Sequence, residues 1–354
     1  MHCLLFITVI SGGGAERVMC QLANQLCISN TVTLVVSDKT KNEYHIDKNV
    51  NLVYLNEKRK KKNFFHQVIQ LRTIIKKEQP DICLSFLPEP NFKALLASVG
   101  TKTKNIISIR NDPNEEYKSN LYKILARLLY RTADGIVFQT NDAKAWFSSG
   151  IQEKSSIIMN QVDDKFFKTE HLNDFSYVAT GRLTKQKNYP LMIRAFSKML
   201  KLYPNEILKI YGEGECFEEL QGLIHELNAE NNIFLMGRSN DIPAVLSEAK
   251  VFLLSSDYEG MPNGLLEALA VGVPCLSTNC PCGGPKMVIK DRTNGMLVPV
   301  KDEQSFYERL LELQESVELR NQIGRAAKQN AKNFASETVF KSWYAYIHNV
   351  LNNK

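Results

Sequence analysis

The stretch VFLLSSDYEGMPNGLLEALAVGVPC, residues 251–275, predicts a strand, a loop and a helix in direct succession. The apolar run VFLL leads into a loop of turn-forming residues, and GLLEALAVG then has the composition of a buried helix. A strand followed by a helix in this way is typical of a parallel sheet covered by helices. Two carboxylates belong to this unit, Glu259 in the loop and Glu267 in the helix.

The same alternation runs along the chain in two series. The first extends from CLLFITVI (3–10) to GIVFQT (135–140), and the second from SYVATGRL (176–183) to GMLVPV (295–300). We therefore predict an α/β fold with two Rossmann-like, doubly wound domains that face each other across a cleft. The polar stretch KTEHLNDF (168–175) is the expected linker. Ligands are expected at the carboxyl ends of the strands, where open parallel sheets bind them.

The composition agrees with a globular protein of two domains. Of 354 residues, 44% are hydrophobic and 23% charged, which excludes a disordered or fibrous protein. The net charge of +6 favours anionic partners. The eight cysteines are scattered, as expected of reduced thiols in a cytosol, and CPC at 280–282 lacks a second ligand pair at zinc spacing. The apolar start lacks signal-peptide features, and no apolar run is long enough to span a bilayer.

The two glutamates flank a predicted anion site. Asn263 and Gly264 fall where the helix should begin and expose backbone amides, which suits a phosphate group. Glu259 and Glu267 could then point into the same cleft. The alternative is that Glu267 only complements the helix dipole and Glu259 is a solvated loop residue.

Three further turns carry candidate ligand-binding residues. GRLTKQKN (181–188) places Arg182, Lys185 and Lys187 at a strand end, where a diphosphate would need positive charge; the alternative is a solvated basic turn. YGEGE supplies Gly212 and Gly214, at which the backbone can approach a ligand closely. SGGGAERV (11–18) matches neither the dinucleotide fingerprint nor the P-loop, so another phosphate or sugar ligand is the candidate there.

Taken together and in this order, the four elements resemble the retaining family-four glycosyltransferases of the two-Rossmann-domain (GT-B) type. The segment STNCPCGGPKMVIKDRTNGMLVPV (277–300) is similar to the bacterial branch that builds O-antigen, capsule and lipid-linked oligosaccharides. The resemblance implies an N-terminal acceptor-binding domain, residues 1–170, to which a C-terminal helix within residues 339–354 returns. It implies a nucleotide-sugar-binding domain at residues 171–338.

The resemblance also assigns roles by position. Arg182 and Lys187 match the basic pair that neutralises the donor diphosphate. Glu267 matches the glutamate that binds the donor ribose, and Glu259 matches the one set against the donor sugar ring. The other matching positions are Gly260, Met261, Asn263 and Gly264 beside the sugar and phosphate, Gly212 in the GEG turn, Gly13 and Gly14 in a turn that closes over the phosphates, and Gly237 and Ile242 at the ends of the loop that meets the base.

A mechanism follows from these roles. The departing diphosphate gains negative charge, which fixed cations at Arg182 and Lys187 and helix amides would stabilise. Since no Asp-x-Asp motif ends a strand, we expect no metal and no cofactor besides the UDP-sugar donor. In this family attack from the face that the phosphate leaves is the favoured route to retention, which makes Glu259 a positioning residue.

The acceptor domain departs from the family pattern at one place. Arg110, Asn111 and Asp112 stand where many relatives carry a histidine. Arg110 is a candidate contact for phosphate or acceptor and Asp112 a candidate proton acceptor; the alternative is a surface salt bridge. IMNQVDDKFF (158–167) resembles the family's Asn-Pro-Val segment, with Gln161 in place of proline, and marks the approach to the hinge.

One dense basic run, KRKKKNFFHQ (58–67), predicts contact with an anionic membrane surface. Basic residues attract acidic headgroups and neighbouring aromatic rings enter the interface. The residues concerned are Lys58, Arg59, Lys60, Lys61, Lys62, Phe64 and Phe65. The alternative is a solubilising loop, whereas nucleic acid is not expected because no recognition motif accompanies the run.

The expectation is a cytoplasmic α-glycosyltransferase held peripherally at the inner face of the cell membrane. It would move a hexose or N-acetylhexosamine from a UDP-sugar to an undecaprenyl-diphosphate-linked saccharide in O-antigen or capsule synthesis. The alternatives are a nucleotide-sugar epimerase or a phosphorylase on the same fold, and a non-catalytic protein that binds glycans or anionic lipids.

Overall fold

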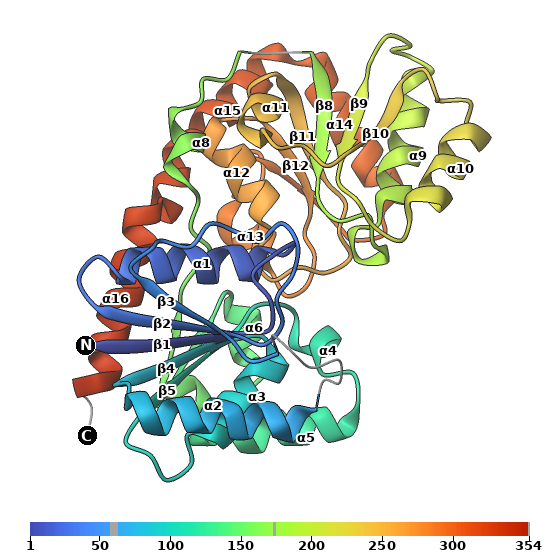
Figure 1. The fold of residues 1–354 in the computed structure, drawn as a ribbon. Coiled ribbons are helices and arrows are strands. Elements are labelled where there is room, and N and C mark those ends of the chain that lie inside the picture. The colour runs from blue at the N-terminus through green and yellow to red at the C-terminus, as the bar shows by residue number, and fades with distance from the viewer. Residues whose placement is uncertain (57–62, 173–174, 353–354) are drawn as a thin grey trace. The chain divides into compact units, whose positions relative to one another are not determined.

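A computed structural model describes residues 1–56, 63–172 and 175–352, which form two compact units (Figure 1). Unit 1 consists of Met1–Asn160 together with Val339–Lys354, and unit 2 of Gln161–Thr338. The α/β class and the two doubly wound sheets expected from the sequence are confirmed. None of the helices in the described ranges is both long and apolar enough to cross a bilayer.

The sheet of unit 1 has the strand order β3-β2-β1-β4-β5-β6-β7, with every neighbouring pair parallel. Its central strands are buried on both faces, which explains their continuous apolar sequence. The chain order reverses between β1 and β4. The strands are β1 (His2–Ile7), β2 (Thr31–Val36), β3 (Val50–Tyr54), β4 (Ile82–Phe86), β5 (Lys104–Ile109), β6 (Gly135–Phe138) and β7 (Ser155–Ile157). The helices are α1 (Gly14–Leu26), α2 (Phe64–Glu78), α3 (Pro88–Ala97), α4 (Pro113–Glu116), α5 (Asn120–Leu129), η1 (Tyr130–Thr132), α6 (Asn141–Ala145) and α7 (Ser149–Glu153).

The sheet of unit 2 has the order β10-β9-β8-β11-β12-β13 and is also parallel. Its order reverses between β8 and β11. The strands are β8 (Ser176–Thr180), β9 (Leu208–Tyr211), β10 (Ile233–Gly237), β11 (Ala249–Leu254), β12 (Cys275–Thr278) and β13 (Met296–Val298). The helices are α8 (Asp164–Lys168), η2 (Lys185–Lys187), α9 (Tyr189–Leu200), α10 (Phe217–Glu226), α11 (Ile242–Ser247), α12 (Asn263–Val271), α13 (Gly284–Val288), α14 (Glu303–Glu315), α15 (Val317–Asn330) and η3 (Ala331–Phe334).

Helix α9 illustrates how the core of unit 2 forms. Pro190 occupies its first turn, where a missing amide hydrogen costs nothing, and Met192, Phe196 and Met199 recur at helical spacing. All three are buried in a cluster that includes β8 and α14. Full burial of such a side chain contributes about 1.5–3 kcal/mol, so this face alone fixes α9 against the sheet.

The unit boundary differs from the expected one. The sequence placed it after residue 170, with KTEHLNDF as linker, whereas the structure places it at Asn160–Gln161, inside the IMNQVDDKFF segment. Val162 pairs with the 334–335 segment, and the Leu172 amide donates to the Ser247 carbonyl at 2.8 Å. Because these partners belong to unit 2, residues 161–172 run along that unit instead of linking the two.

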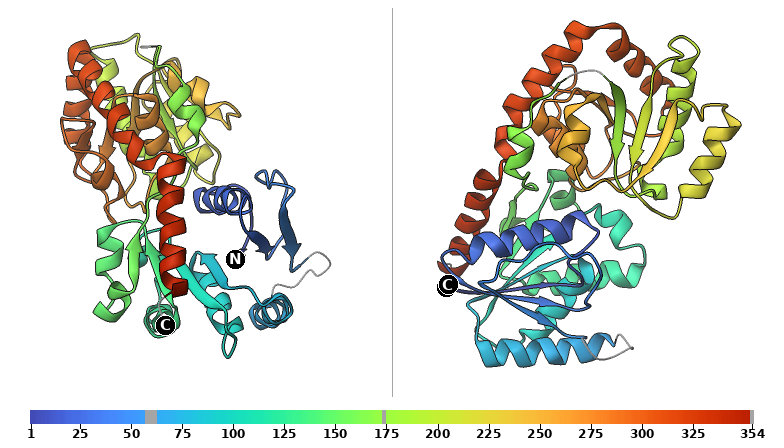
Figure 2. Two further views of the ribbon diagram at one scale, coloured as in Figure 1. Left: turned by 90° about the vertical axis from the view of Figure 1, so that its left-hand side faces the viewer. Right: turned by 45° about the horizontal axis from the view of Figure 1, so that its top comes forward.

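Helix α16 (Ser336–Asn352) packs against the sheet of unit 1, as the resemblance implies (Figure 2). The Trp343 ring stacks on Phe86 with centroids 5.6 Å apart. The Tyr346 hydroxyl accepts a hydrogen bond from the Ile136 amide at 2.7 Å. The buried face of the helix therefore completes the core of unit 1.

Candidate functional site

Two loops meet at the carboxyl ends of β8 and β11, where the strand order of unit 2 reverses. The turn after β8 and the loop after β11 are joined by hydrogen bonds. The Ser255 hydroxyl donates to the Lys187 carbonyl, the Asp257 amide to the Gln186 carbonyl, and the Gln186 side chain to the Tyr258 carbonyl, each at 2.9 Å. The two loops thus form one platform at the place where open α/β sheets bind ligands.

Lys187 and Glu259 form an ion pair in this platform. The Lys187 ammonium lies 2.5 Å from Oε1 of Glu259, and their side chains are 15% and 9% exposed. The Ser256 hydroxyl donates to the same oxygen at 2.8 Å, and Thr278 in turn donates to the Ser256 carbonyl at 2.6 Å. Within the described ranges, no group donates to Oε2 of Glu259. One carboxylate oxygen of Glu259 is therefore fixed by the protein.

The sequence left open that Glu259 is a solvated loop residue. That alternative is wrong, because Glu259 is only 7% exposed. Sequence reasoning did not foresee its pairing with Lys187 or its support by Ser256 and Thr278. The signal available was the pair of hydroxyl residues at the end of the β11 segment, just before the loop.

The CPCGG segment (280–284) is hydrogen-bonded to the loop that carries Glu259. The Glu259 amide donates to the Pro281 carbonyl at 2.7 Å, and the Cys282 amide donates back to Glu259 at 3.0 Å. A Cβ on Gly284 would lie 1.8 Å from the Gly260 carbonyl oxygen, so only glycine allows this contact. Burial raises the pKa of the Cys280 thiol, with Glu259 adding to the effect. In the described ranges no group of three or more His, Cys, Asp or Glu side chains could hold a metal ion.

Arg182 differs from Lys187 in its surroundings. Its side chain is exposed and forms no hydrogen bond or ion pair with any described residue. The turn that carries it is fixed by Gly212, since a Cβ there would lie 1.8 Å from the Gly181 carbonyl oxygen. A Cβ on Gly214 would similarly fall 2.3 Å from the Leu183 carbonyl. The close approach expected at these glycines is therefore between two backbone segments, and a ligand contact at Gly212 stays a prediction.

Helix α12 begins at Asn263 with Pro262 as its N-cap, and no side chain caps this end. Within the first turn the amides of Leu265 and Leu266 donate to the Pro262 carbonyl, at 3.1 and 3.2 Å. A Cβ on Gly264 would lie 2.4 Å from the Thr180 hydroxyl, so the start of α12 packs directly on the end of β8. Glu267 is buried in this helix, as are Gly260 and Met261 in the preceding loop. Glu267 thus lies in the same part of unit 2 as the ion pair.

The predicted base-binding loop borders the same edge of the sheet. Gly237 ends β10 with a left-handed backbone, and its carbonyl accepts from the Gly212 amide at 2.8 Å. Ile242 begins α11, whose N-terminus is capped by Asp241. Gly237 therefore lies next to Gly212, and Ile242 lies at the start of α11.

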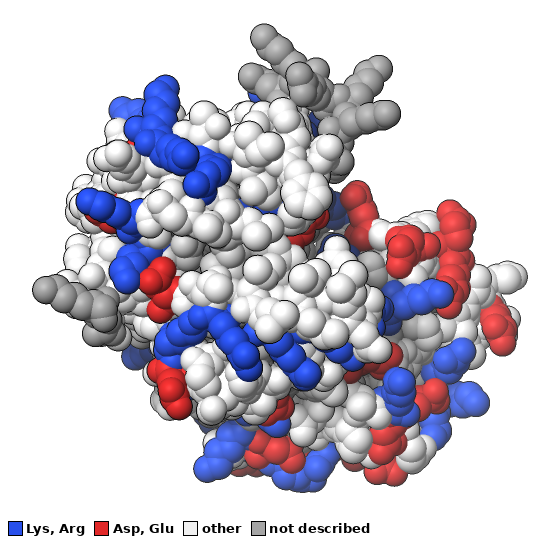
Figure 3. Space-filling model, turned by 90° about the horizontal axis from the view of Figure 1, so that it is seen from below, with Lys and Arg blue, Asp and Glu red and all other residues white. Residues whose placement is uncertain are grey.

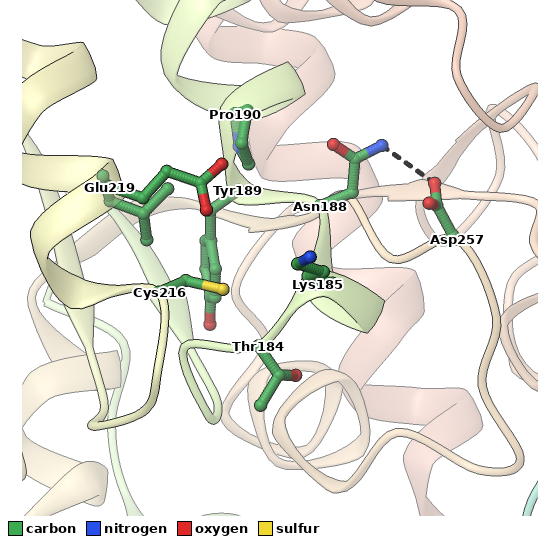
Figure 4. A pocket seen from close by; sticks show the side chains of 9 residues that line it. Thr184, Lys185, Asn188, Tyr189, Pro190, Cys216, Glu219 and Asp257 are labelled. Carbon is green, nitrogen blue, oxygen red and sulfur yellow. Dashed lines mark hydrogen bonds between the residues drawn. The ribbon is translucent and has the colours of Figure 1, made fainter.

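A small pocket of about 140 Å³ lies beside the platform (Figure 4). Asn188, which donates to Asp257 at 2.8 Å, forms one side, and Cys216 and Glu219 lie at the other. Ligand pockets usually enclose about 300–1,000 Å³, so this cavity is too small for a nucleotide sugar. Arg182, Lys187, Glu259 and Glu267 are not among its lining residues.

In unit 1, Arg110 follows β5 and is buried. Its guanidinium lies 4.4 Å from the centre of the Phe86 ring, and Nη2 donates to Asn160. Nε and Nη1 have no hydrogen-bond partner among the described residues. Burial lowers the pKa of Arg110 to about 9, against the opposing effect of Glu16 and Glu116. The alternative of a surface salt bridge is wrong, because Arg110 and Asp112 are both buried.

Asp112 caps α4, accepting a hydrogen bond from the Asn114 amide at 2.9 Å. Next to it is Glu116, which sequence reasoning missed. Burial, followed by the charge of Asp112, raises the pKa of Glu116 to about 8, while Arg110 opposes the shift. The carboxyl of Glu116 is thus protonated near neutral pH.

Two other sets of predicted residues belong to unit 1. Gly13 is the N-cap of α1 and Gly14 its first residue, and the Gly13 carbonyl accepts from the Tyr44 hydroxyl at 3.2 Å. In the basic run, Lys58, Arg59, Lys60, Lys61 and Lys62 lie outside the described residues. Phe64 and Phe65 begin α2, with Phe65 largely exposed.

Two family models match the chain. The model described as Glycosyltransferase Family 4 matches residues 12–166, and the model described as Glycosyl transferases group 1 matches residues 161–330. The chain belongs to glycosyltransferase family 4.

Two curated relatives of this glycosyltransferase come from Campylobacter jejuni. One is named GalNAc-alpha-(1->4)-GalNAc-alpha-(1->3)-diNAcBac-PP-undecaprenol alpha-1,4-N-acetyl-D-galactosaminyltransferase; it is 27% identical, over 99% of this chain and 99% of its own. The other is named N-acetylgalactosamine-N,N'-diacetylbacillosaminyl-diphospho-undecaprenol 4-alpha-N-acetylgalactosaminyltransferase, with 29% identity over 97% and 98%. Among solved structures, Anabaena HepE in complex with UDP has a TM-score of 0.84 at 17% identity, covering 99% of this chain and 100% of HepE. That likeness establishes the fold.

Proposed function

We propose that this glycosyltransferase moves a hexose or N-acetylhexosamine, with retention, from a UDP-sugar to an undecaprenyl-diphosphate-linked saccharide in bacterial O-antigen or capsule synthesis. The observation that carries the donor assignment is the platform at β8 and β11. It brings Arg182, the Lys187–Glu259 pair and the start of α12 to one sheet edge. HepE, which shares the fold, binds UDP.

The two Campylobacter relatives support a lipid-linked saccharide as the acceptor. Both Campylobacter enzymes act, by name, on undecaprenyl-linked saccharides, and they match this chain over almost its whole length. A lipid-linked acceptor requires the enzyme to work at a membrane surface. We therefore place it in the cytoplasm, peripherally at the inner face of the cell membrane.

The positive charges of the platform suit the departure of a diphosphate. As the bond between the sugar C1 and the β-phosphate oxygen breaks, the departing diphosphate gains negative charge. Arg182, Lys187 and the amides at the start of α12 can stabilise it without rearranging, so neither a metal nor a cofactor is required. The acceptor hydroxyl then bonds to C1 from the same face and passes its proton to the departing phosphate.

In this scheme Glu259 is a positioning residue. Its Oε1 is held by Lys187 and Ser256, and we assign its Oε2 to a hydroxyl of the donor sugar. Glu267, buried in α12, is assigned to the donor ribose. Arg110, Asp112, Gly13 and Gly14 of unit 1 are assigned to acceptor and phosphate contacts.

The test is a transfer assay with UDP-Glc, UDP-Gal, UDP-GlcNAc and UDP-GalNAc, each with short-chain undecaprenyl-diphosphate saccharides and EDTA. The expected product carries one added sugar in α linkage by NMR. Arg182→Ala should abolish it, whereas Arg194→Ala, on the exposed face of α9, should not. Conversion of a UDP-sugar without acceptor would indicate an epimerase instead, and phosphate-dependent breakdown of a glycan a phosphorylase. Saccharide or vesicle binding with no turnover would indicate a binding protein.

A further inference from the structure

Helix α5 of unit 1 exposes the apolar side chains that an amphipathic helix normally buries. Ala126 is its buried residue, whereas Leu121, Ile124, Leu125 and Leu128 are 64%, 53%, 36% and 54% exposed. At 3.6 residues per turn these four positions fall within an arc of about 100°, so they form one stripe. We call these four residues the α5 stripe. A contiguous exposed apolar stripe of this kind is typical of an interaction surface.

Exposed apolar side chains also occur on α2. Figure 2 shows α3 between α2 and α5. On one side the Phe92 ring of α3 lies 6.0 Å from Tyr122 of α5, and on the other Lys93 lies 5.5 Å from the Phe64 ring of α2. Phe65 and Ile69 of α2 are 71% and 62% exposed. The two helices therefore present apolar groups on either side of α3.

Helix α5 and the residues next to it are basic, although Lys118 is paired with the preceding Glu115 at 3.4 Å. Residues 117–131 contain Lys118, Lys123, Arg127 and Arg131 and no acidic residue. Arg127 is held against Trp146, with its guanidinium 4.8 Å from the ring centre. Figure 3, which views the underside of Figure 1, shows an uncharged area with Lys and Arg side chains along part of its edge and Asp and Glu side chains along other parts. An apolar stripe with basic residues beside it matches the interface of an anionic lipid leaflet.

We propose that the α5 stripe, together with the exposed end of α2, docks this glycosyltransferase onto an anionic membrane surface. A second copy of the chain is disfavoured, because a two-fold dimer would bring the same basic residues together. The choice of a membrane rests in part on the lipid-linked acceptor of the proposed function. The apolar groups would enter the headgroup region while Lys123 and Arg131 contact acidic lipids.

The test is co-sedimentation of the full chain with phosphatidylcholine vesicles that contain or lack phosphatidylglycerol. A variant carrying Leu121→Ser, Ile124→Ser and Leu128→Ser should bind the anionic vesicles at least about tenfold more weakly. Ile28→Ser, at another exposed apolar residue of unit 1, is the matched control and should bind like the wild type. Lys123→Glu with Arg131→Glu should remove the dependence on phosphatidylglycerol.

A second measurement does not depend on the triple variant folding. Leu121→Trp places an indole on the stripe, and its emission should shift to the blue and be quenched by brominated lipid when vesicles are added. Unchanged emission would overturn the proposal. So would full vesicle binding by the triple variant, or a vesicle-independent dimer that the variant abolishes. The triple variant should retain stabilisation by a UDP-sugar; absence of that stabilisation in the wild type would count against the proposed function alone.

Discussion

The Lys187 ammonium lies 2.5 Å from Oε1 of Glu259, although the two residues are 72 positions apart in the chain. They meet because β8 and β11 are neighbours at the reversal point of the sheet, each leading into its own loop. The pair places a cation and a carboxylate in fixed relative positions before any ligand binds. Such preorganisation is what electrostatic stabilisation of a departing diphosphate requires.

Lys187 and Glu259 should contribute to the free energy of unfolding as a coupled pair. Lys187→Met leaves the Glu259 carboxylate buried without its cation, so we expect the free energy of unfolding to fall by about 3 kcal/mol. Lys187→Met combined with Glu259→Gln should cost clearly less than the sum of the two single changes. Urea unfolding of the four proteins measures this coupling. Strict additivity would mean that the two side chains do not interact in solution.

Arg182 should matter for function and not for folding. Its side chain is exposed and forms no hydrogen bond or ion pair with a described residue, so Arg182→Ala should change the free energy of unfolding by no more than about 0.5 kcal/mol. The same change should lower kcat/KM about 100-fold or more if the guanidinium stabilises the leaving diphosphate. Arg194→Ala serves as the control. Wild-type kinetics for Arg182→Ala would remove this residue from the site.

The glycines of unit 2 give opposite predictions at two positions. A Cβ on Gly212 would lie 1.8 Å from the Gly181 carbonyl oxygen, whereas a Cβ on Gly222, within α10, meets nothing within 4 Å. Gly212→Ala should therefore destabilise the protein by several kcal/mol, at or beyond the usual range of about 0.5–3 kcal/mol. Gly222→Ala should stabilise it by about 0.5–1 kcal/mol. Thermal unfolding distinguishes the two, and equal effects would contradict the packing described at Gly212.

Glu116 should make stability depend on pH. Its folded-state pKa is raised to about 8, whereas in an unfolded chain a glutamate titrates near about 4.3. Between these values the folded state holds a proton that the unfolded state has lost, so this group's contribution to stability falls as pH rises. Relative to wild type, Glu116→Gln should therefore become progressively more stable from about pH 5 to pH 8.

The control for this prediction is Glu115→Gln, at a carboxylate that faces Lys118 at 3.4 Å. Its stability relative to wild type should vary much less over the same range. A stability difference between Glu116→Gln and wild type that does not change with pH would show that Glu116 is ionised in the folded protein.

Much of the fold could be predicted because parallel strands buried on both faces leave a strong pattern. VFLLSSD and SYVATGRL are apolar because both sheet faces are covered, and each is followed at once by a turn. The unit boundary was harder. KTEHLNDF looks like a linker by composition, yet its backbone pairs with Ser247 and Glu248, contacts that polarity alone does not indicate.

The site was predicted only in part, for a similar reason. Position in a family motif identified Lys187 and Glu259 separately, but their pairing depends on which strands are neighbours. The sequence predicted that the backbone is closely approached at Gly212, and the group that approaches it is the Gly181 carbonyl. Glu116 carried no motif at all; its raised pKa arises from burial and from Asp112, which only the folded chain brings together.

Unit 2 should bind a nucleotide sugar at the platform of Arg182, Lys187 and Glu259. Thermal unfolding of the full chain with UDP-, GDP- and ADP-sugars, in EDTA, tests it most directly. A UDP-sugar at 100 times its dissociation constant should add about 2.7 kcal/mol of stability to the wild type. Arg182→Ala should lose this gain and Arg194→Ala should keep it. Absence of stabilisation by every nucleotide sugar, or equal stabilisation of Arg182→Ala, would contradict the account.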